Sequence, residues 1–338
     1  MLYPLTFHPL FKERVWGGRR LEELYRKPLP PGVSIGESWE ISDRPGDVSV
    51  IANGPLAGKD LHWLMEQHPR ELLGGARPRS GRFPLLVKLL DARERLSLQV
   101  HPPPPKAAEL GGEPKTEMWY IAEAGPDAEL YAGLRRGVTR QEFERKIRTG
   151  EVAGCFHRIP VRTGDAMFLP SGRVHAIGAG LVIFEIQQNS DTTYRVFDWN
   201  RVGLDGKPRE LHLAQSLASI DFNDFEPALV DSAFSSAGRF KIRPLARHAL
   251  FKADAFRAVS QESIVFQQPR LRIIAVLEKR VSVSGDNHTV ELQPGRFCLV
   301  PAGVAQARIA TEIGSSFLLI EPGDKSDLTN VPLVGRGS

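Results

Sequence analysis

Four residues stand out in this sequence because their side chains and spacing suit a metal ion. They are Gln99, His101, Glu117 and His175. A β-strand would point Gln99 and His101 to the same face, since one residue separates them. Glu117 opens an apolar run typical of a second strand, and His175 follows a Pro-Ser-Gly turn. One amide oxygen, two imidazoles and one carboxylate suit a borderline divalent ion with an open coordination position, as in catalytic sites.

Each of these residues also has an ordinary structural interpretation. An isolated histidine is more often exposed or packed than bound to a metal, and we interpret the other histidines in that way. His101 and His175 differ because each lies at a strand beside other candidate ligands. Glu117 could be a surface carboxylate at the start of its strand. Gln99 is the weakest candidate, since its amide could instead hydrogen-bond a metal-bound water.

The rest of the sequence predicts a mainly β protein with helical insertions. Short apolar runs ended by Gly, Pro or Asp indicate strands at 36–41, 83–90, 96–100, 118–122, 166–169, 181–187 and 194–198. The spacing of apolar residues predicts a helix over 59–73, and a capping box of Thr139 and Glu142 begins another over 139–149. A third helix is expected over 211–218.

The sequence also contains a repeat displaced by 131 positions. The matching pairs are Gly164 and Gly295, Pro170 and Pro301, Gly172 and Gly303, and His175 and Gln306. This pattern predicts one β-barrel unit used twice. We expect a catalytic, metal-binding domain over 1–230, with helical insertions in and after its barrel, then a linker over 231–238 and a second barrel over 238–325. Because Gln306 replaces the histidine, the second barrel is expected to lack metal ligands and to have a structural role, with ligand binding as the alternative.

Composition places the chain among globular proteins. Of its 338 residues 41% are hydrophobic and 25% charged, and the net charge of +4 favours an anionic ligand only mildly. The sequence has no basic run interleaved with aromatic residues, so we do not expect a nucleic-acid partner. No segment reaches the roughly 20 apolar residues of a membrane helix. The first residues lack the pattern of a secretion signal. Cys155 and Cys298 have no metal or redox spacing, so we expect buried thiols in a cytoplasmic protein. No obligate protein partner is expected.

Several motifs occur in a fixed order along the chain. They are WGGRRL at 16–21, GESWE at 36–40, LSLQVHP at 96–102, KTE at 115–117, PSGRVH at 170–175 and DTTYR at 191–195. Together they resemble type I mannose-6-phosphate isomerase, a zinc-dependent family of the cupin superfamily, and the first two motifs look like its short bacterial branch. The resemblance covers essentially the whole chain and implies two cupin-type (jelly-roll) β-barrels with one Zn²⁺ per chain.

The resemblance also implies roles for individual residues. The zinc ligands of the family fall on the same four residues that the spacing selects, and its active-site arginine falls on Arg195. The family's glutamate and aspartate on the preceding strand match Glu185 and Asp191, and we expect Asp191 to contact the substrate. Family members often have Lys-Pro-Glu where this chain has Lys115, Thr116 and the ligand glutamate, so lysine and ligand stay in place.

The implied reaction interconverts mannose 6-phosphate and fructose 6-phosphate by moving a proton between C2 and C1 through an enediol. Zinc and Arg195 suit the negative charge that develops on the sugar oxygen. Lys115, Glu185 or a metal-bound water could be the base, and the sequence does not choose among them. Ser97 and Arg201 are candidates for holding the phosphate, although they could equally be a strand hydroxyl and a solvated loop charge.

Two other functions remain open from the sequence. Two histidines and one glutamate also describe the facial triad of non-haem iron oxygenases, many of which use cupin barrels. Charged residues after the barrel strand, namely Glu185, Asp191 and Arg195, suit a sugar phosphate better than the apolar substrate of an oxygenase. A non-catalytic sugar-binding protein with two cupin barrels is the second alternative.

Overall fold

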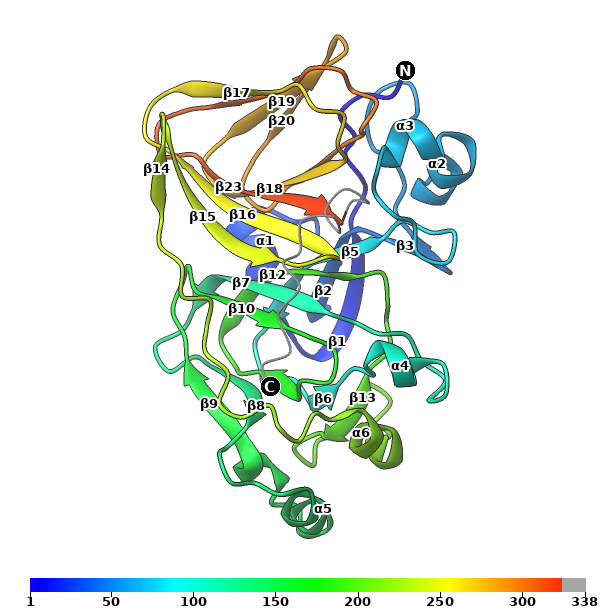
Figure 1. Ribbon diagram of the computed structural model, residues 1–338, viewed down its shortest axis with the longest axis vertical. Helices are drawn as coiled ribbons and strands as arrows, with labels where there is room; N and C mark the ends of the chain where they lie inside the picture. The colour runs from blue at the N-terminus through cyan, green and yellow to red at the C-terminus, as the bar shows by residue number, and fades with distance from the viewer. Residues whose placement is uncertain (324–338) are drawn as a thin grey trace, which may run out of the picture. The chain divides into compact units, whose positions relative to one another are not determined.

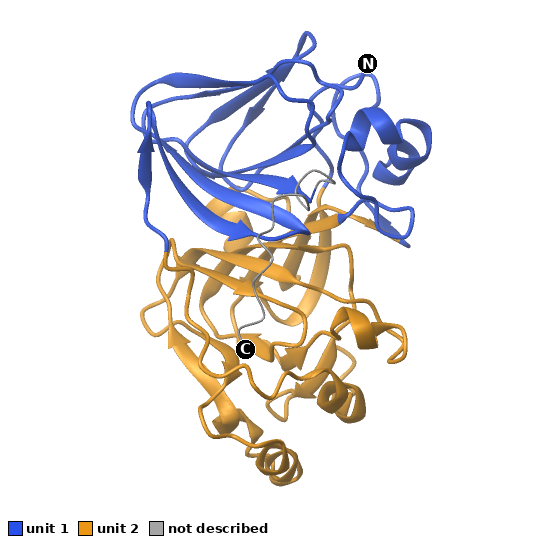
Figure 2. Ribbon diagram, in the orientation of Figure 1, with its two compact units in different colours: residues 1–8, 45–84, 232–338 blue, residues 9–44, 85–231 orange. Residues whose placement is uncertain are grey.

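Strands dominate the computed structural model, which describes residues 1–323 of the chain (Figure 1). The chain forms two compact units (Figure 2). Unit 2 contains residues 9–44 and 85–231, and unit 1 contains residues 1–8, 45–84 and the chain from 232 onward. The chain therefore begins and ends in unit 1 and crosses between the units four times, after residues 8, 44, 84 and 231.

Unit 2 consists of two antiparallel sheets with short helices. The six-stranded sheet has the order β1 (Leu10–Gly18), β2 (Ile35–Ile41), β5 (Leu85–Ala92), β12 (Leu181–Gln188), β7 (Glu117–Ala124) and β10 (Ala166–Leu169). The five-stranded sheet has the order β13 (Tyr194–Phe197), β6 (Leu98–Val100), β11 (His175–Ile177), β8 (Glu129–Leu134) and β9 (Phe156–Pro160). The helices are α1 (Arg20–Tyr25), α4 (Pro104–Ala107), α5 (Arg140–Thr149), the 3₁₀ helix η1 (Val152–Cys155) and α6 (Leu213–Ser219).

Unit 1 repeats this strand order with fewer strands in its smaller sheet. Its six-stranded sheet has the order β14 (Ser235–Ala237), β15 (Phe240–Arg247), β16 (Phe251–Ala258), β23 (Ser316–Pro322), β18 (Arg272–Glu278) and β21 (Phe297–Val300). Its four-stranded sheet has the order β17 (Glu262–Phe266), β22 (Ala307–Thr311), β19 (Val281–Gly285) and β20 (His288–Leu292). Two helices, α2 (Leu61–Gln67) and α3 (Pro69–Leu73), complete it. The short strands β3 (Asp43–Arg44) and β4 (Asp47–Val48) lie where the chain passes between the units.

The central strands of the larger sheet in unit 2 are buried along their whole length. Every residue of β5 and of its neighbour β12 is buried, and most of them are apolar. Lys88 on β5 and Glu185 on β12 are the opposite charges in this apolar surrounding, and the two residues face each other in the strand register. A charged residue is rarely fully buried without a partner. This buried pair therefore indicates that the sheet contributes functional residues as well as a core.

Strands β1 and β2 approach each other closely at two glycines. A Cβ atom added to Gly17 would lie 2.4 Å from the backbone nitrogen of Gly36, and one added to Gly36 would lie 2.6 Å from Cβ of Arg14. Any larger side chain would force the strands apart at this point. This close approach explains the glycines in two of the sequence motifs and places Glu37 beside β5.

All seven predicted strands are present, with ends that shift by at most a few residues. The helix predicted over 59–73 is wrong as a single element. Asp60 accepts a hydrogen bond from the backbone of Trp63 at 2.7 Å and begins α2, but this helix ends at Gln67. Pro69 lacks a backbone N–H and so begins a second helix, α3, instead of continuing the first. The short helices α1 and α4 were not predicted.

Residues 1–8 and 45–84 lie in unit 1, although we expected the whole range 1–230 in one domain. Leu5 exchanges two backbone hydrogen bonds of 2.8 Å with Leu299, and Phe7 pairs with Ile51. These bridges join three segments that are far apart in the sequence. The last crossing between the units, at residues 231 and 232, falls within the segment predicted as a linker.

Cys155 and Cys298 are free and buried, which confirms the prediction of buried thiols. Within residues 1–323, no helix combines the length and the apolar composition needed to span a membrane.

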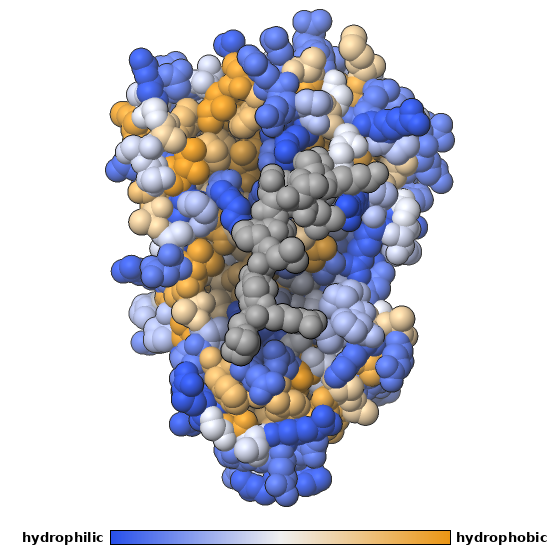
Figure 3. All heavy atoms as spheres, in the orientation of Figure 1, coloured by the Kyte–Doolittle hydropathy of each residue, from blue (hydrophilic) through white to orange (hydrophobic). Residues whose placement is uncertain are grey.

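Helix α5 begins at the predicted cap and faces solvent. The Thr139 hydroxyl accepts a hydrogen bond from the backbone of Glu142 at 3.1 Å, while the Glu142 carboxylate pairs with Lys146. Phe143 is the buried residue of this helix, and the surface over α5 is mostly hydrophilic (Figure 3). The N-terminal cap therefore contributes a larger share of the stability of this helix than it would in a helix with a large buried apolar face.

We predict that Thr139→Ala destabilises α5 by about 1 kcal/mol, because the N-terminal N–H groups lose their acceptor. Amide hydrogen exchange in α5, followed by mass spectrometry, should speed up roughly fivefold. Thr139→Ser keeps the hydroxyl and serves as the matched control. Equal exchange rates in the alanine and serine variants would contradict the role of the cap.

Candidate metal centre and active site

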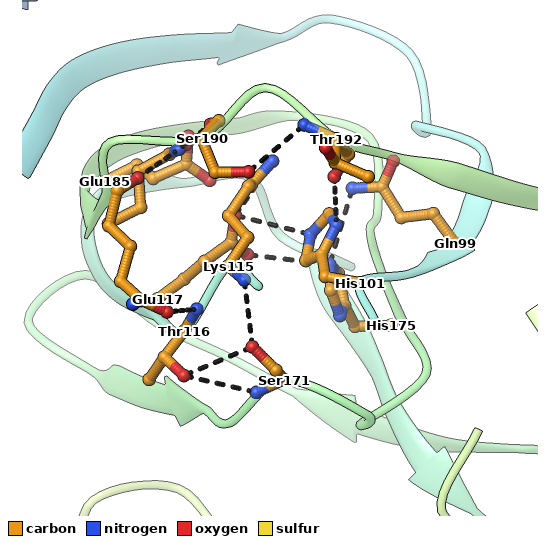
Figure 4. Close-up of polar contacts among 12 residues, drawn as sticks. Gln99, His101, Lys115, Thr116, Glu117, Ser171, His175, Glu185, Ser190 and Thr192 are labelled. Carbon is orange, nitrogen blue, oxygen red and sulfur yellow. Dashed lines mark hydrogen bonds and ion pairs between the residues drawn. The ribbon is translucent and has the colours of Figure 1, made fainter. Parts of the chain in front are cut away.

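Three of the four predicted ligands form a compact buried cluster in unit 2 (Figure 4). The candidate ligand atoms of His101, Glu117 and His175 all lie within 4.8 Å of one another. The His101 Nε2 atom is 3.4 Å from Oε1 of Glu117, and the His175 Nε2 atom is 3.5 Å from Oε2. The side-chain amide of Gln99 lies 3.4 Å from Nε2 of His175, so the fourth predicted residue is also adjacent.

Both sheets of unit 2 contribute to this cluster. Gln99 on β6 lies directly opposite His175, the first residue of β11, in the five-stranded sheet. His101 follows the end of β6, and Glu117 is the first residue of β7 in the six-stranded sheet. The strand ends therefore bring together residues from three separate parts of the sequence.

Backbone carbonyls orient both imidazole rings. The Nδ1 atom of His101 lies 2.8 Å from the carbonyl oxygen of Thr192, and that of His175 lies 2.9 Å from the carbonyl of Arg173. An N–H at Nδ1 leaves the lone pair of Nε2 free, and in each ring this Nε2 atom faces Glu117. Among the described residues, His101 Nε2 and both carboxylate oxygens of Glu117 are buried without a hydrogen bond. Such atoms fit a divalent metal ion, which would satisfy all of them together.

The electrostatic surroundings favour the ligand forms of these side chains. Burial and the nearby Lys115 ammonium lower the pKa of His101 to about 3, and burial lowers the pKa of His175 as well. Burial alone would raise the pKa of Glu117, but Lys115, 3.1 Å away, and the histidines hold it well below its usual range. Neutral imidazoles and an ionised carboxylate are the forms that coordinate metals.

A cavity of about 540 Å³ opens beside the cluster. The predicted residues that line it are Ser97, Gln99, Lys115, Glu185, Asp191 and Arg195. Six further charged residues in the lining were not predicted, namely Glu13, Arg14, Glu37, Lys88, Asp205 and Arg209. Arg201 is absent from the lining, because its guanidinium binds Asp198 and the carbonyl oxygen of Arg95.

A row of four charged and aromatic side chains crosses the sheet, and three of them, Lys88, Glu185 and Trp119, line this cavity. Trp39, Lys88, Glu185 and Trp119 lie opposite one another on β2, β5, β12 and β7. The Lys88 ammonium is 3.3 Å from Glu185 and 3.6 Å from Glu37. Burial opposes the charge of Lys88, but these two carboxylates outweigh it and raise its pKa. One sequence signal could have identified Lys88, since it lies between two apolar runs, Leu85–Val87 and Leu89–Leu90, of the same strand.

The pKa values of Glu185 and Glu37 shift in opposite directions although both carboxyl groups contact Lys88. Burial raises the pKa of Glu185, and the Glu117 charge adds to this effect. Lys88 and Arg14 overcome the burial of Glu37 and lower its pKa to about 2. Glu185 also accepts a hydrogen bond of 2.8 Å from the Trp119 indole, which fixes its position. Glu185 is therefore the carboxyl group better suited to accept and return a proton near neutral pH.

Hydrogen bonds connect the segment that carries Lys115 to the turn before His175 (Figure 4). The backbone N–H of Lys115 donates to the Ser171 hydroxyl at 2.9 Å, and that of Thr116 donates to the Gln188 side chain at 2.9 Å. The Thr116 and Ser171 hydroxyls are 3.3 Å apart. A proline at position 116 could make neither of the Thr116 contacts, so this chain holds the segment by hydrogen bonds of its own.

Arg195 on β13 lines the cavity beside the candidate ligands. It faces Gln99 in the register of β13 and β6, and it donates to the carbonyl oxygen of Glu210 at 2.7 Å. Burial, and after it the neighbouring Arg209, lower the pKa of Arg195, whereas the carboxylates of Asp198 and Glu210 act in the opposite direction.

A mainly β unit with a buried His/Glu/His centre beside a charged cavity is typical of metal-dependent cupin enzymes. Comparison with known proteins is more specific. The family model "Phosphomannose isomerase type I, catalytic domain" matches residues 5–117. Mannose-6-phosphate isomerase ManA of Bacillus subtilis is 36% identical over 311 residues, which cover 90% of this chain and 95% of that protein. The chain belongs to the type I phosphomannose isomerase family, as its motifs indicated.

Further relatives agree with this assignment. The mannose-6-phosphate isomerase of Streptococcus mutans is 42% identical over 218 residues, which cover 64% of this chain and 67% of that protein. The crystal structure of mannose 6-phosphate isomerase from Bacillus subtilis superposes with a TM-score of 0.85 at 32% identity, covering 95% of this chain and all of the other. A phosphomannose isomerase variant from Salmonella typhimurium, at 18% identity and a TM-score of 0.73, shares the fold.

We predict that His101→Ala and Glu117→Gln abolish metal binding, because each removes one of the clustered ligand atoms. Metal content after gel filtration, measured by mass spectrometry, should fall from one ion per chain to background. A chelator should lower the melting temperature of the wild type but not of these variants. His157→Ala changes a histidine of β9 outside the cluster and should keep its metal, and full metal content in Glu117→Gln would refute the proposed centre.

We predict that Ser171→Ala lowers the free energy of unfolding by roughly 1 to 3 kcal/mol, since the Lys115 N–H loses its acceptor. Urea unfolding of the metal-loaded protein measures this change. Ser171→Thr retains the hydroxyl and should recover most of the loss. If alanine and threonine variants unfold alike at the wild-type midpoint, the hydrogen bond contributes nothing.

Proposed function

We propose that the protein interconverts mannose 6-phosphate and fructose 6-phosphate and that the buried centre holds one Zn²⁺. One observation carries this proposal beyond the family assignment, namely the charge of the cavity. Lys88, Lys115 and Arg195 line it together with Glu185 and Asp191, directly beside the candidate ligands. Such a lining suits a hydroxylated, anionic substrate and disfavours the apolar substrate of an oxygenase.

The donor set supports zinc, because imidazole nitrogens and carboxylate oxygens are its usual ligands in catalytic sites. When bound, the ion supplies positive charge for the sugar oxygen that becomes negative during enolisation. Gln99, His101, Glu117 and His175 would hold it. Arg195, next to Gln99 in the strand register, adds a fixed cation at the same side of the cavity.

We assign the proton transfer between C2 and C1 to Glu185. Its raised pKa and its hydrogen bond from Trp119 support this role. Lys115 lies 3.1 Å from the ligand oxygen of Glu117 and therefore acts better as a donor to substrate oxygens than as the base. Lys88 holds Glu185 in place and limits the rise of its pKa.

Ser97 and Asp191 line the cavity and are proposed to hold the hydroxyl and phosphate groups of the sugar. Arg201 was expected to bind the phosphate, and its contacts with Asp198 favour an indirect contribution through that carboxylate. The two sheets of each unit are proposed to form one cupin-type barrel. Only unit 2 would be catalytic, and unit 1 would have a structural role. A sugar-phosphate substrate suits a cytoplasmic enzyme without an obligate protein partner.

A coupled assay for fructose 6-phosphate formation from mannose 6-phosphate, with and without chelator, tests the proposal. We expect turnover that chelation removes and Zn²⁺ restores, and metal analysis that finds zinc. Oxygen uptake with bound iron would favour an oxygenase. Binding of mannose 6-phosphate without exchange of its C2 proton with solvent would favour a sugar-binding protein.

We predict that Glu185→Gln lowers kcat at least about a hundredfold, because the amide cannot accept the C2 proton. Deuterium exchange into recovered mannose 6-phosphate should stop, while zinc content stays at the wild-type level. Glu66→Gln, an exposed substitution in unit 1, is the control and should exchange normally. Wild-type exchange in Glu185→Gln would reassign the base.

A further inference from the structure

A second cavity, of about 490 Å³, opens in unit 2 at a distance from the metal centre. Leu181 in its lining faces Ala124, the last residue of β7. Gln187, six residues further along β12, faces the ligand Glu117, the first residue of β7. The two positions are therefore roughly 20 Å apart along the strands. A cavity of this volume has room for a small organic ligand.

The two cavities also use opposite faces of the six-stranded sheet. Asp91 on β5 faces Val182 on β12, and both residues line the second cavity. Lys88 and Glu185 are another facing pair on the same two strands, and they line the first cavity. The two pairs are three positions apart along each strand, and side chains alternate between the faces of a sheet. The second cavity is therefore separate from the candidate active site.

Asp91 is a buried charged residue in this lining, with an exposed fraction of 1%. Its Oδ2 atom accepts a hydrogen bond of 2.7 Å from the backbone N–H of Arg20. Its other oxygen, Oδ1, receives no hydrogen bond from the part of the chain that the structure describes, so it is free to bind a ligand. A Cβ atom added to Gly18 would lie 2.8 Å from Oδ2 and 3.0 Å from Oδ1. The glycine therefore keeps the space over the carboxylate open.

Three carboxylates and the Arg20 side chain meet in the lining. Arg20 forms ion pairs with Glu23 on its own helix and with Glu123 on β7. Its single charge cannot offset these two carboxylates and Asp91 as well. Burial raises the pKa of Asp91 to about 6, and the charges of Glu23 and Glu123 add to this rise, whereas Arg20 opposes it. The carboxylate of Asp91 thus lacks a counter-charge of its own.

The other two arginines in the lining do not supply this counter-charge. The guanidinium group of Arg19 donates to Glu22 and to the carbonyl oxygens of Pro30 and Val33. Arg93 is exposed, so water and salt screen its charge. A positively charged ligand would therefore be stabilised at the buried carboxylate, because it would compensate the loss of hydration there.

The rest of the lining indicates the class of this ligand. Within residues 1–323, only the His/Glu/His cluster brings together three side chains that could hold a metal ion. The second cavity has apolar residues in its lining instead, namely Ala92, Ala124, Leu181 and Val182. An ammonium group on a short hydrocarbon chain combines positive charge and hydrogen-bond donors with an apolar body that suits these residues.

We propose that the second cavity of unit 2 binds a small organic cation, whose ammonium group donates a hydrogen bond to Oδ1 of Asp91. Glu23 and Glu123 add attraction at longer range, since they share one arginine. The inference is independent of the proposed function, because neither the metal centre nor its cavity takes part in it.

Titration calorimetry of the metal-loaded protein with n-butylammonium chloride, at constant ionic strength, tests the inference. We expect saturable binding in the wild type. Asp91→Asn keeps an acceptor for the Arg20 N–H but removes the charge, and it should raise Kd about 10- to 100-fold. Asp127→Asn changes an exposed aspartate outside the lining and should bind as the wild type does. The neutral analogue 1-butanol should bind at least about tenfold more weakly than butylammonium.

The affinity should also depend on pH through Asp91. A cation binds the ionised carboxylate, whose pKa is about 6, so Kd should rise about tenfold from pH 7 to pH 5 as the carboxyl group takes up a proton. This dependence should disappear in Asp91→Asn. Gly18→Ala places a methyl group over the carboxylate and should also weaken binding.

An absence of saturable binding to the wild type, or an unchanged Kd in Asp91→Asn, would overturn the inference. If that variant does not fold, equal affinity of the wild type at pH 5 and pH 7 would overturn it as well. Displacement of butylammonium by an equal concentration of potassium ions would assign the cavity to an inorganic cation and refute the proposed ligand class.

Discussion

The buried negative charge of Glu117 is the constraint on which the rest of unit 2 depends. A carboxylate without access to water is stable only when nearby cations or donors replace its hydration. Lys115 at 3.1 Å supplies one positive charge, and the Nε2 atoms of His101 and His175 face its oxygens without an intervening proton donor. The carbonyl groups that orient the two rings therefore produce an arrangement that a divalent ion completes.

The same principle extends from the ligands to the floor of the cavity. Lys88, Glu185 and Glu37 are charged residues in a largely apolar part of the sheet, and Lys88 contacts both carboxylates. Well-packed apolar residues would stabilise such strands at least as well as this network does. The network instead separates the pKa values of two carboxyl groups, because the pKa of Glu37 is lowered and that of Glu185 is raised. Residues in this sheet thus combine a structural position with control of protonation.

Much of unit 2 could be predicted because its signals are local. Strand positions follow from short apolar runs, and Gln99 and His101 share a face because strands alternate. The break at Pro69 could also have been predicted, since proline cannot continue a helix, but the apolar spacing over 59–73 outweighed it. The bridge between Leu5 and Leu299 could not have been predicted, because no local pattern relates residues that are almost the whole chain apart.

By itself, the sequence determined the candidate ligands, the strand periodicity and the family, since each depends on residue identity and short-range order. Tertiary structure alone decided which charges share a cavity. Lys88 and Glu37 reach Glu185 only because β2, β5 and β12 are neighbours, and Arg209 reaches Asp198 only because its loop turns back on β13. Long-range pairing and burial set the distances and pKa values of these groups, and neither quantity is encoded in the spacing of residues along the chain.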